Sequence, residues 1–227
     1  WVFLLKSAVK RLNQLSWRVD NARDYKTNGY TRLRCGSTDA SIINQEGKIK
    51  AIHLAGAGNM VTMLINSELG LEDMHIAEAI KRDPLAQVLS VYHIRHEDGT
   101  VQFFNEPLPA ALFGRVVIVT PDGLVPVERD IPLETIKRVR QTAKKRVFVT
   151  NSLRALASVS PTHNVRDIPF VVIVGGSALD FEIPQLVTDA LSQYALVAGR
   201  GNIRGIEGAR NAVATGLVLS YAQRGGL

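Results

Sequence analysis

The residues best suited to chemistry in this sequence lie in two short glycine-containing turns. Gly36-Ser37-Thr38-Asp39 is a compact polar turn, but Arg32 and Arg34 precede it where a phosphate-binding turn usually carries small or acidic residues. The run "VVIVGGSALD" places Gly175-Gly176-Ser177 after an apolar stretch. Because glycine has no Cβ, this turn would let the backbone approach a flat ligand, and Ser177 would add a hydroxyl contact. A tight strand-to-helix turn explains the same three residues equally well.

A pair of opposite charges in "AEAIK" could contact a sugar. Glu78 and Lys81 are three residues apart, which places them on one face of a helix. The carboxylate can accept hydrogen bonds from ribose hydroxyls, and the ammonium can add a charged contact. On spacing alone, an exposed ion pair within one helix is the better explanation.

Other motifs give weaker signals. "GAGNMV" has Val61 at the third glycine position of a dinucleotide fingerprint and follows a hairpin strand, so we do not expect a dinucleotide site. The basic run 137–146 shares a helix with an apolar face. We interpret its basic side chains as a solvated face rather than a phosphate-binding surface. The five histidines show no metal-ligand spacing. No Ser, His and Asp set is evident either, so we assign no metal site and no catalytic residue.

The elements that would position these residues alternate in type along the chain. Alternation predicts a β-hairpin over 41–55, and further hairpins around Asp98-Gly99 and within 114–128. Helical spacing predicts helices over 56–70, 71–82 and 133–159, the last as one long helix or two abutting ones. A buried strand, a turn and a helix are expected over 168–194, and a strand, a glycine-rich loop and a helix over 195–223. This order predicts a mixed α/β fold.

Charge is distributed unevenly along the chain. The net charge is +6, and residues 1–35 account for all of it with eight basic and two acidic side chains. Both tryptophans and the single cysteine, Cys35, lie there too. We therefore expect an atypical leader over 1–35 outside the fold, a domain over 36–222 and a tail over 223–227. Nucleic-acid binding would rest on the leader alone, and we do not expect it. No apolar run approaches the roughly 20 residues of a membrane span, so no membrane association is expected.

Several motifs together resemble one protein family. The GSTD turn with its hairpin, "GAGNMVTMLI", "AEAIK", "VVIVGGSALDFEIPQ" and "GNIRGIEGARNAVATGL" are similar to the C-terminal half of the ATPase domain in the large subunit of diol or glycerol dehydratase reactivating factors. The resemblance runs in unbroken order from about Gly36 to Tyr221. It implies one lobe, the second, of an actin-like (ribonuclease H-like) ATPase, with a mixed sheet and flanking helices.

The resemblance implies a role for each candidate residue in binding ATP or ADP with Mg²⁺. Gly36, Ser37, Thr38 and Asp39 would form the second phosphate loop. Glu78 and Lys81 would hold the ribose and adenine side. Gly175, Gly176 and Ser177 would form the adenosine turn, and Arg210 would lie near the base.

The sequence departs from the family pattern just before the phosphate loop. The family has Asp-Leu-Gly-Ala before Gly-Ser-Thr-Asp, whereas this chain has Arg32, Leu33, Arg34 and Cys35. The change removes a carboxylate that could bind Mg²⁺ or its waters, and it crowds the phosphate position. The family's first lobe, with its metal-binding carboxylates, has no counterpart in these residues. We expect a fragment with weak or no independent ATPase activity.

The family's role sets the expected function and partners. With a small partner subunit, the large subunit uses nucleotide to release damaged cobalamin from an inactivated diol or glycerol dehydratase. We expect the reactivase small subunit and the dehydratase as partners, in the cytoplasm, with association with a microcompartment left open. The alternative is a non-catalytic interaction domain that docks on a dehydratase or a reactivase subunit. Whether the client is a diol or a glycerol dehydratase stays open.

Overall fold

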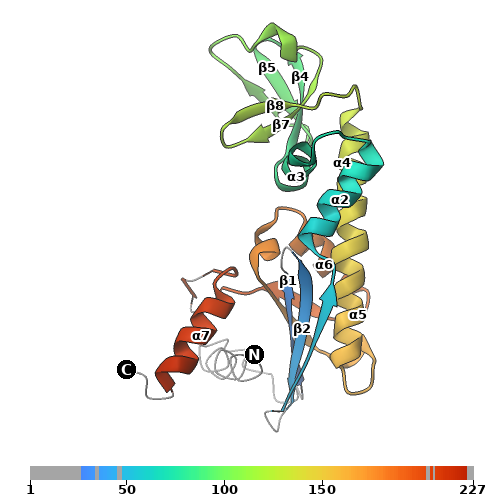
Figure 1. The fold of residues 1–227 in the computed structure, drawn as a ribbon, viewed down its shortest axis with the longest axis vertical. Helices are drawn as coiled ribbons and strands as arrows, with labels where there is room; N and C mark the ends of the chain where they lie inside the picture. Colours follow the sequence, from blue (N-terminus) through green and yellow to red (C-terminus); the bar gives the residue numbers. More distant parts are fainter. Residues whose placement is uncertain (1–26, 34–35, 45–47, 203–204, 207, 224–227) are drawn as a thin grey trace. The chain divides into compact units, whose positions relative to one another are not determined.

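The computed structural model describes residues 27–33, 36–44, 48–202, 205–206 and 208–223 (Figure 1). Contacts divide the chain into two compact units. Unit one comprises the described residues up to Gly58 together with those from Lys145 onward, and unit two is Asn59–Lys144. The single domain expected over 36–222 is therefore made of two units, and the chain enters unit two at Asn59 and leaves it at Lys144.

Unit one is built on a five-stranded mixed sheet. Its strand order is β10-β9-β1-β2-β3. The strands are β1 (Thr27–Leu33), β2 (Ser37–Asn44), β3 (Ile49–Ala55), β9 (Phe170–Val174) and β10 (Val197–Arg200). β9 pairs in parallel with β1 and β10, whereas β2 pairs antiparallel with β1 and β3. The carboxyl ends of β1, β3, β9 and β10 therefore lie at one edge of the sheet.

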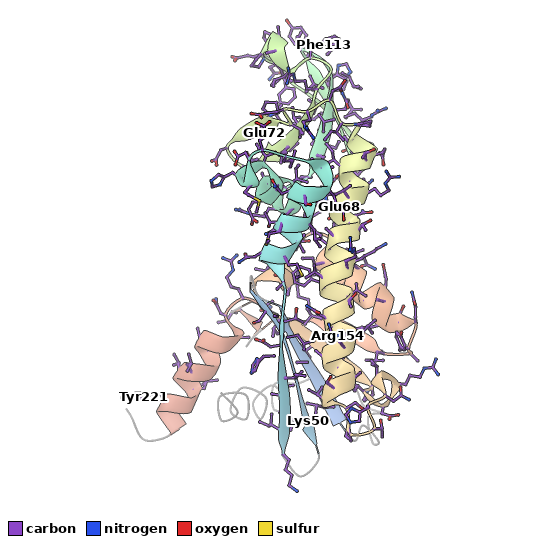
Figure 2. The ribbon with its side chains drawn as sticks, turned by 45° about the vertical axis from the view of Figure 1, so that its right-hand side comes forward. Lys50, Glu68, Glu72, Phe113, Arg154 and Tyr221 are labelled. Atoms are coloured by element: carbon purple, nitrogen blue, oxygen red, sulfur yellow. The ribbon has the colours of Figure 1, made fainter. Side chains whose placement is uncertain are left out.

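Unit one also contains helices and short 3₁₀ turns. α5 (Thr150–Val159) contacts β2 and β3, and α6 (Ile183–Ser192) contacts β10. Short 3₁₀ turns occur at Val165–Asp167 and Gly176–Leu179. α7 (Ala212–Gln223) has no charged residue, and its Tyr221, labelled in Figure 2, is exposed.

One expectation about the leader is corrected. β1 lies in the middle of the sheet, where Thr31 is in register with both Ala40 of β2 and Ile173 of β9. Charge and composition set residues 1–35 apart, but neither prevents a strand. Residues 27–33 therefore belong to the fold, while 1–26 and 34–35 lie outside the described residues, as does most of the expected tail.

Unit two combines a small antiparallel sheet with three helices. The sheet order is β6-β5-β4-β7-β8. Its strands are β4 (Leu85–Ser90), β5 (His93–His96), β6 (Val101–Phe103), β7 (Val116–Thr120) and β8 (Gly123–Pro126). The helices are α2 (Gly58–Leu69), α3 (Met74–Arg82) and α4 (Leu133–Lys144), with a 3₁₀ turn at Ala110–Leu112. The strands of this sheet contribute a buried core, which consists of Ala86, Val88, Ile94 and Val117.

The predicted helix ends agree with the observed ones. α2 ends before Gly70, whose φ of 61° is the left-handed conformation typical of a helix C-terminal glycine. Asp73 caps α3 by accepting a 2.7 Å hydrogen bond from the His75 amide, and α3 ends at Arg82, just before Asp83-Pro84. Among the described residues, no helix combines the length and apolar character that crossing a bilayer requires.

The helical stretch expected over 133–159 contains an irregularity. A π-helical turn, Lys145–Val149, separates α4 from α5. The extra residue in this turn changes which side chains face inward. The solvated face expected for the basic run 137–146 is also wrong in part, because Arg140 and Lys144 are fully buried. Arg140 Nη2 lies 2.8 Å from Glu97 Oε2, so a carboxylate in the turn between β5 and β6 compensates this buried guanidinium.

Candidate functional site

The Gly36–Asp39 turn opens β2 at the carboxyl edge of the unit-one sheet. Gly36 is exposed, and no heavy atom of the described residues lies within 4 Å of the position a Cβ would take. Thr38 is buried, and its hydroxyl donates to Gly56 O at 3.1 Å. The Gly56 amide in turn donates to Gly36 O at 3.3 Å. These two bonds tie the start of β2 to the end of β3, with open space beside Gly36 for a ligand.

The loop that follows β3 is held from a second side by Asn151. Its side-chain amide donates to Ala55 O at 3.1 Å and to Gly56 O at 2.8 Å. Gly56 has a φ of 94°, which favours glycine. α2 begins two residues later with no acidic side chain in its first turn, so the partial positive charge of its N-terminus suits an anion. Sequence reasoning missed Asn151, which belongs to no motif.

A carboxylate and an imidazole form a pair beside this turn. Asp39 and His53 are in register across β2 and β3, and Asp39 Oδ1 lies 3.0 Å from His53 Nδ1. Asp39 is 5% exposed, whereas His53 lies largely in solvent. Sequence reasoning considered His53 only as a metal ligand. The register of the predicted hairpin was the signal that could have paired it with Asp39.

The fit to a nucleotide and the fit to a metal ion differ. The exposed backbone at Gly36 suits phosphate groups. Among the described residues, no group of three His, Cys, Asp or Glu side chains is placed to hold a metal ion. Asp39 is the carboxylate of this turn, and it already contacts His53. The described residues of this turn therefore suit nucleotide phosphate.

The Gly175–Ser177 turn follows β9 at the same edge of the sheet. Gly175 has a φ of 102°, and its amide donates to Ala209 O at 2.8 Å. A Cβ at Gly176 would meet no heavy atom within 4 Å in the part of the chain that the structure describes, so the turn presents open backbone there. Arg210 follows Ala209 directly and is exposed. The structure thus brings the segment of Arg210 next to this turn.

Glu78 and Lys81 form a cluster with Thr62 inside unit two. Lys81 is 8% exposed, which differs from the exposed pair that the spacing favours. Its ammonium donates to Thr62 Oγ1 at 2.9 Å and to Glu78 Oε2, and the Thr62 hydroxyl donates to the same Oε2 at 2.5 Å. Burial raises the pKa of Glu78. The hydrogen bonds from Lys81 and Thr62 outweigh this effect and leave the pKa of Glu78 below its ordinary value.

The predicted residues thus fall into two groups. Gly36–Asp39, Gly175–Ser177 and Arg210 belong to unit one, and the first two turns lie at one edge of its sheet. Glu78 and Lys81 belong to unit two. Sequence reasoning missed Thr62, and also Arg82, an exposed cation whose charge further lowers the pKa of Glu78. The charge of Arg82 and its spacing of four residues from Glu78 were the available signals.

Comparisons with known proteins agree on one family. Residues 31–221 match the family described as "Diol dehydratase reactivase ATPase-like domain". The chain is 68% identical over 189 residues to the propanediol dehydratase-reactivating factor large subunit of Salmonella typhimurium, covering 83% of this chain and 31% of that protein. The chain therefore spans under a third of the length of this curated relative.

Solved structures agree on the fold. A diol dehydratase-reactivating factor in nucleotide-free form has a TM-score of 0.86 and 59% identity, covering 97% of this chain and 35% of that one. An archaeal actin homologue, Ta0583, has a TM-score of 0.53 at 14% identity, covering 97% of this chain and 54% of that one. The second likeness concerns the fold alone. The chain has the α/β fold of one lobe of an actin-like, ribonuclease H-like ATPase.

Proposed function

Because the chain belongs to the diol dehydratase reactivase ATPase-like family, we propose that it binds ATP or ADP as one lobe of a reactivating-factor large subunit. The observation that carries the proposal is the meeting of three turns, Gly36–Asp39, Ala55–Gly58 and Gly175–Ser177, at one edge of the unit-one sheet. In open α/β sheets, ligands bind outside the carboxyl ends of the strands.

Each group of residues has its own task in this proposal. The backbone of Gly36–Thr38 and the first amides of α2 bind phosphate. Gly175–Ser177 lies against adenosine, with Arg210 near the base. Glu78 and Lys81 contact the ribose and adenine side. Thr38 and Asn151 hold the Gly56 carbonyl and so fix the shape of the loop. Mg²⁺, when bound with the nucleotide, would neutralise phosphate charge.

The biological role follows from the names of the relatives. The Salmonella protein is a propanediol dehydratase-reactivating factor large subunit. We propose that this chain likewise serves a cobalamin-dependent diol or glycerol dehydratase in the cytoplasm. Together with a small subunit, it would couple nucleotide binding to release of damaged cofactor. As one lobe of such an ATPase, we expect this chain to show weak or no hydrolysis on its own.

Titration with fluorescently labelled ADP tests the proposal. We expect saturable binding that weakens at least about tenfold in Lys81→Ala, since a charge-assisted contact is lost. Ser177→Ala gives an independent variant in unit one. Arg154→Ala removes an exposed charge from α5 and is the matched control, expected to bind like the wild type.

The same titration separates the rival function. A non-catalytic domain that docks on a dehydratase or reactivase subunit needs no nucleotide. Absence of ADP binding at millimolar concentration therefore favours that rival. ATP turnover by this chain that Lys81→Ala abolishes would contradict the expectation of weak or no hydrolysis.

A further inference from the structure

The strand β6 is an exposed edge of the unit-two sheet. It ends the strand order β6-β5-β4-β7-β8, and within the described residues no further strand pairs with its outer side. Its residues Val101, Gln102 and Phe103 are all exposed. Natural proteins usually protect such an edge with charged residues or proline. The opposite edge, β8, contains Pro126, whereas β6 has neither proline nor a charged residue. The outer side of β6 is therefore open to pairing with another strand.

The hydrogen bonds around β6 show which of its backbone groups face this open side. The Thr100 carbonyl accepts from the last amide of β5 at 2.8 Å, and the Phe104 amide donates to the carbonyl that precedes β5 at 2.9 Å. In an antiparallel pair, alternate residues bond to a given neighbouring strand. The amides and carbonyls of Val101 and Phe103 therefore point away from β5, toward the free edge.

Apolar side chains gather beside this edge. Phe103 is 75% exposed, and its ring centroid lies 5.4 Å from that of His93 on β5. Val101 shares the strand, and the exposed Leu89 and Tyr92 come from the end of β4 and the turn that follows it. We call Leu89, Tyr92, Val101 and Phe103 the β6 patch. With about 200 Å² for a whole aromatic residue, their exposed fractions leave roughly 400 Å² of the patch in contact with solvent. Exposed apolar patches of this size often serve association.

We propose that two copies of this chain associate through their β6 edges, related by a two-fold axis at Gln102. In this antiparallel register Val101 of one copy lies opposite Phe103 of the other, so the outward amides and carbonyls of both copies bond to each other. One face then carries a continuous row, in which His93 and Phe103 of one copy are followed by Val101 and Arg95 of the other. This row places no like charges side by side. The inference goes beyond nucleotide binding and does not depend on it.

The area and the charge of the β6 patch support a second copy as its occupant. Each partner in a standard interface buries about 800 Å², of which about 55–65% is apolar. The patch supplies most of that apolar share by itself. A two-fold axis opposes the same patch on both copies, so the aromatic residues of each copy would be covered by those of the other. The strand also carries no charge that would select an acidic or a basic partner instead.

The mass of the chain in solution tests the inference. We expect analytical ultracentrifugation of the 227-residue chain to show dimers at micromolar concentration. Phe103→Lys and Val101→Lys each place a charge in the contact and should raise the dissociation constant at least about thirtyfold, as loss of an interface hot spot does. Met74→Lys makes the same kind of change at an exposed apolar residue of α3, in the same unit, and should associate like the wild type.

A disulfide tests the register. Residues opposite each other in a non-hydrogen-bonded antiparallel pair have Cα atoms about 4.5 Å apart, a distance that a disulfide can span. Gln102 would face its own counterpart in such a pair. With Cys35, the single cysteine of the sequence, replaced by serine, Gln102→Cys should give a covalent dimer in oxidised glutathione. Thr100→Cys is the matched control, because Phe104 would lie opposite it, and it should give little covalent dimer.

The outcomes separate this contact from others and from the proposed function. A wild-type chain that is monomeric throughout the micromolar range overturns the inference, as does a dimer that both lysine variants leave intact. A dimer that Tyr221→Lys disrupts and Phe103→Lys does not would place the contact on α7 instead, where Tyr221 is exposed. Equal covalent yields from Gln102→Cys and Thr100→Cys would contradict the register. Because the changed side chains are exposed, circular dichroism should show the wild-type fold in each variant, and a monomer that still binds ADP leaves the proposed function intact.

Discussion

At the scale of single residues, the buried ammonium of Lys81 determines how the α2–α3 cluster behaves. A charge removed from water is tolerated only with partners, and Lys81 has Glu78 and Thr62. The spacing of Glu78 and Lys81 predicted a pair but could not predict burial, because the third partner comes from another helix. Thr62 is separated from Lys81 by 19 positions in the chain.

The pKa of Glu78 lies below its ordinary value of 4.5, and this gives a pH-dependent stability. The pair stabilises the fold fully above about pH 4.5, and the contribution is lost as pH falls through the lower folded pKa. Glu78→Gln should therefore cost about 1 kcal/mol near neutral pH, a modest value because the carboxylate is part-exposed, and less below pH 4.5.

Denaturant unfolding followed by circular dichroism between pH 3 and 7 measures this difference. Glu72→Gln, which changes an exposed carboxylate labelled in Figure 2, is the matched control and should keep the wild-type pH profile. Parallel profiles for Glu78→Gln and the wild type would show that the pair does not contribute to stability.

Gly70 meets two constraints at once. Its φ is +61°, and a Cβ there would lie 2.5 Å from Arg129 Nη1, which donates to Leu69 O at 3.1 Å. Gly70→Ala should cost about 2–3 kcal/mol, from the left-handed backbone and the displaced arginine. Gly114→Ala has a similar φ of +75° and open space, so it should cost only about 1–2 kcal/mol. Equal losses in thermal or chemical unfolding would exclude a role for Arg129.

At the scale of elements, periodicity predicted most of the fold. The hairpins, α2, α3 and the strand β9 follow from alternation, helical spacing and glycine or proline at their ends. The π-helical turn Lys145–Val149 and the burial of Arg140 could not be predicted in this way. Both depend on contacts between elements distant in sequence, and Glu97 is 43 positions from Arg140.

The ion pair between Glu97 and Arg140 joins the β5–β6 hairpin to α4. Arg140 is fully buried, and the Glu97 side chain is 10% exposed. Glu97→Gln takes an ionic partner from this buried guanidinium, so it should destabilise the chain by about 3 kcal/mol. Glu106→Gln, an exposed carboxylate of the same unit, should change stability by less than about 0.5 kcal/mol. Urea unfolding compares the two variants, and a near-neutral Glu97→Gln would contradict this account.

At the scale of the whole molecule, the sequence identified the nucleotide-binding candidates but misplaced one boundary. The Gly175–Ser177 turn was found because it follows an apolar strand, and the Gly36–Asp39 turn because its compact polar residues precede an alternating hairpin. The leader was assigned from charge and composition, which do not report strand pairing. The partners that place β1 in the sheet, β2 and β9, come from separate parts of the chain, and β9 begins at Phe170.

A proline in β1 tests whether this strand holds unit one together. Thr31 is in register with Ala40 on one side and Ile173 on the other. Proline removes the amide donor and is poorly tolerated in a central strand, so Thr31→Pro should cost about 3 kcal/mol or more. Thr31→Val keeps the backbone amide and is the matched control. Because the chain divides into two compact units, hydrogen exchange should show lost protection in β2 and β9 and retained protection within Asn59–Lys144. Unchanged protection in β2 and β9 would return residues 27–33 to the leader.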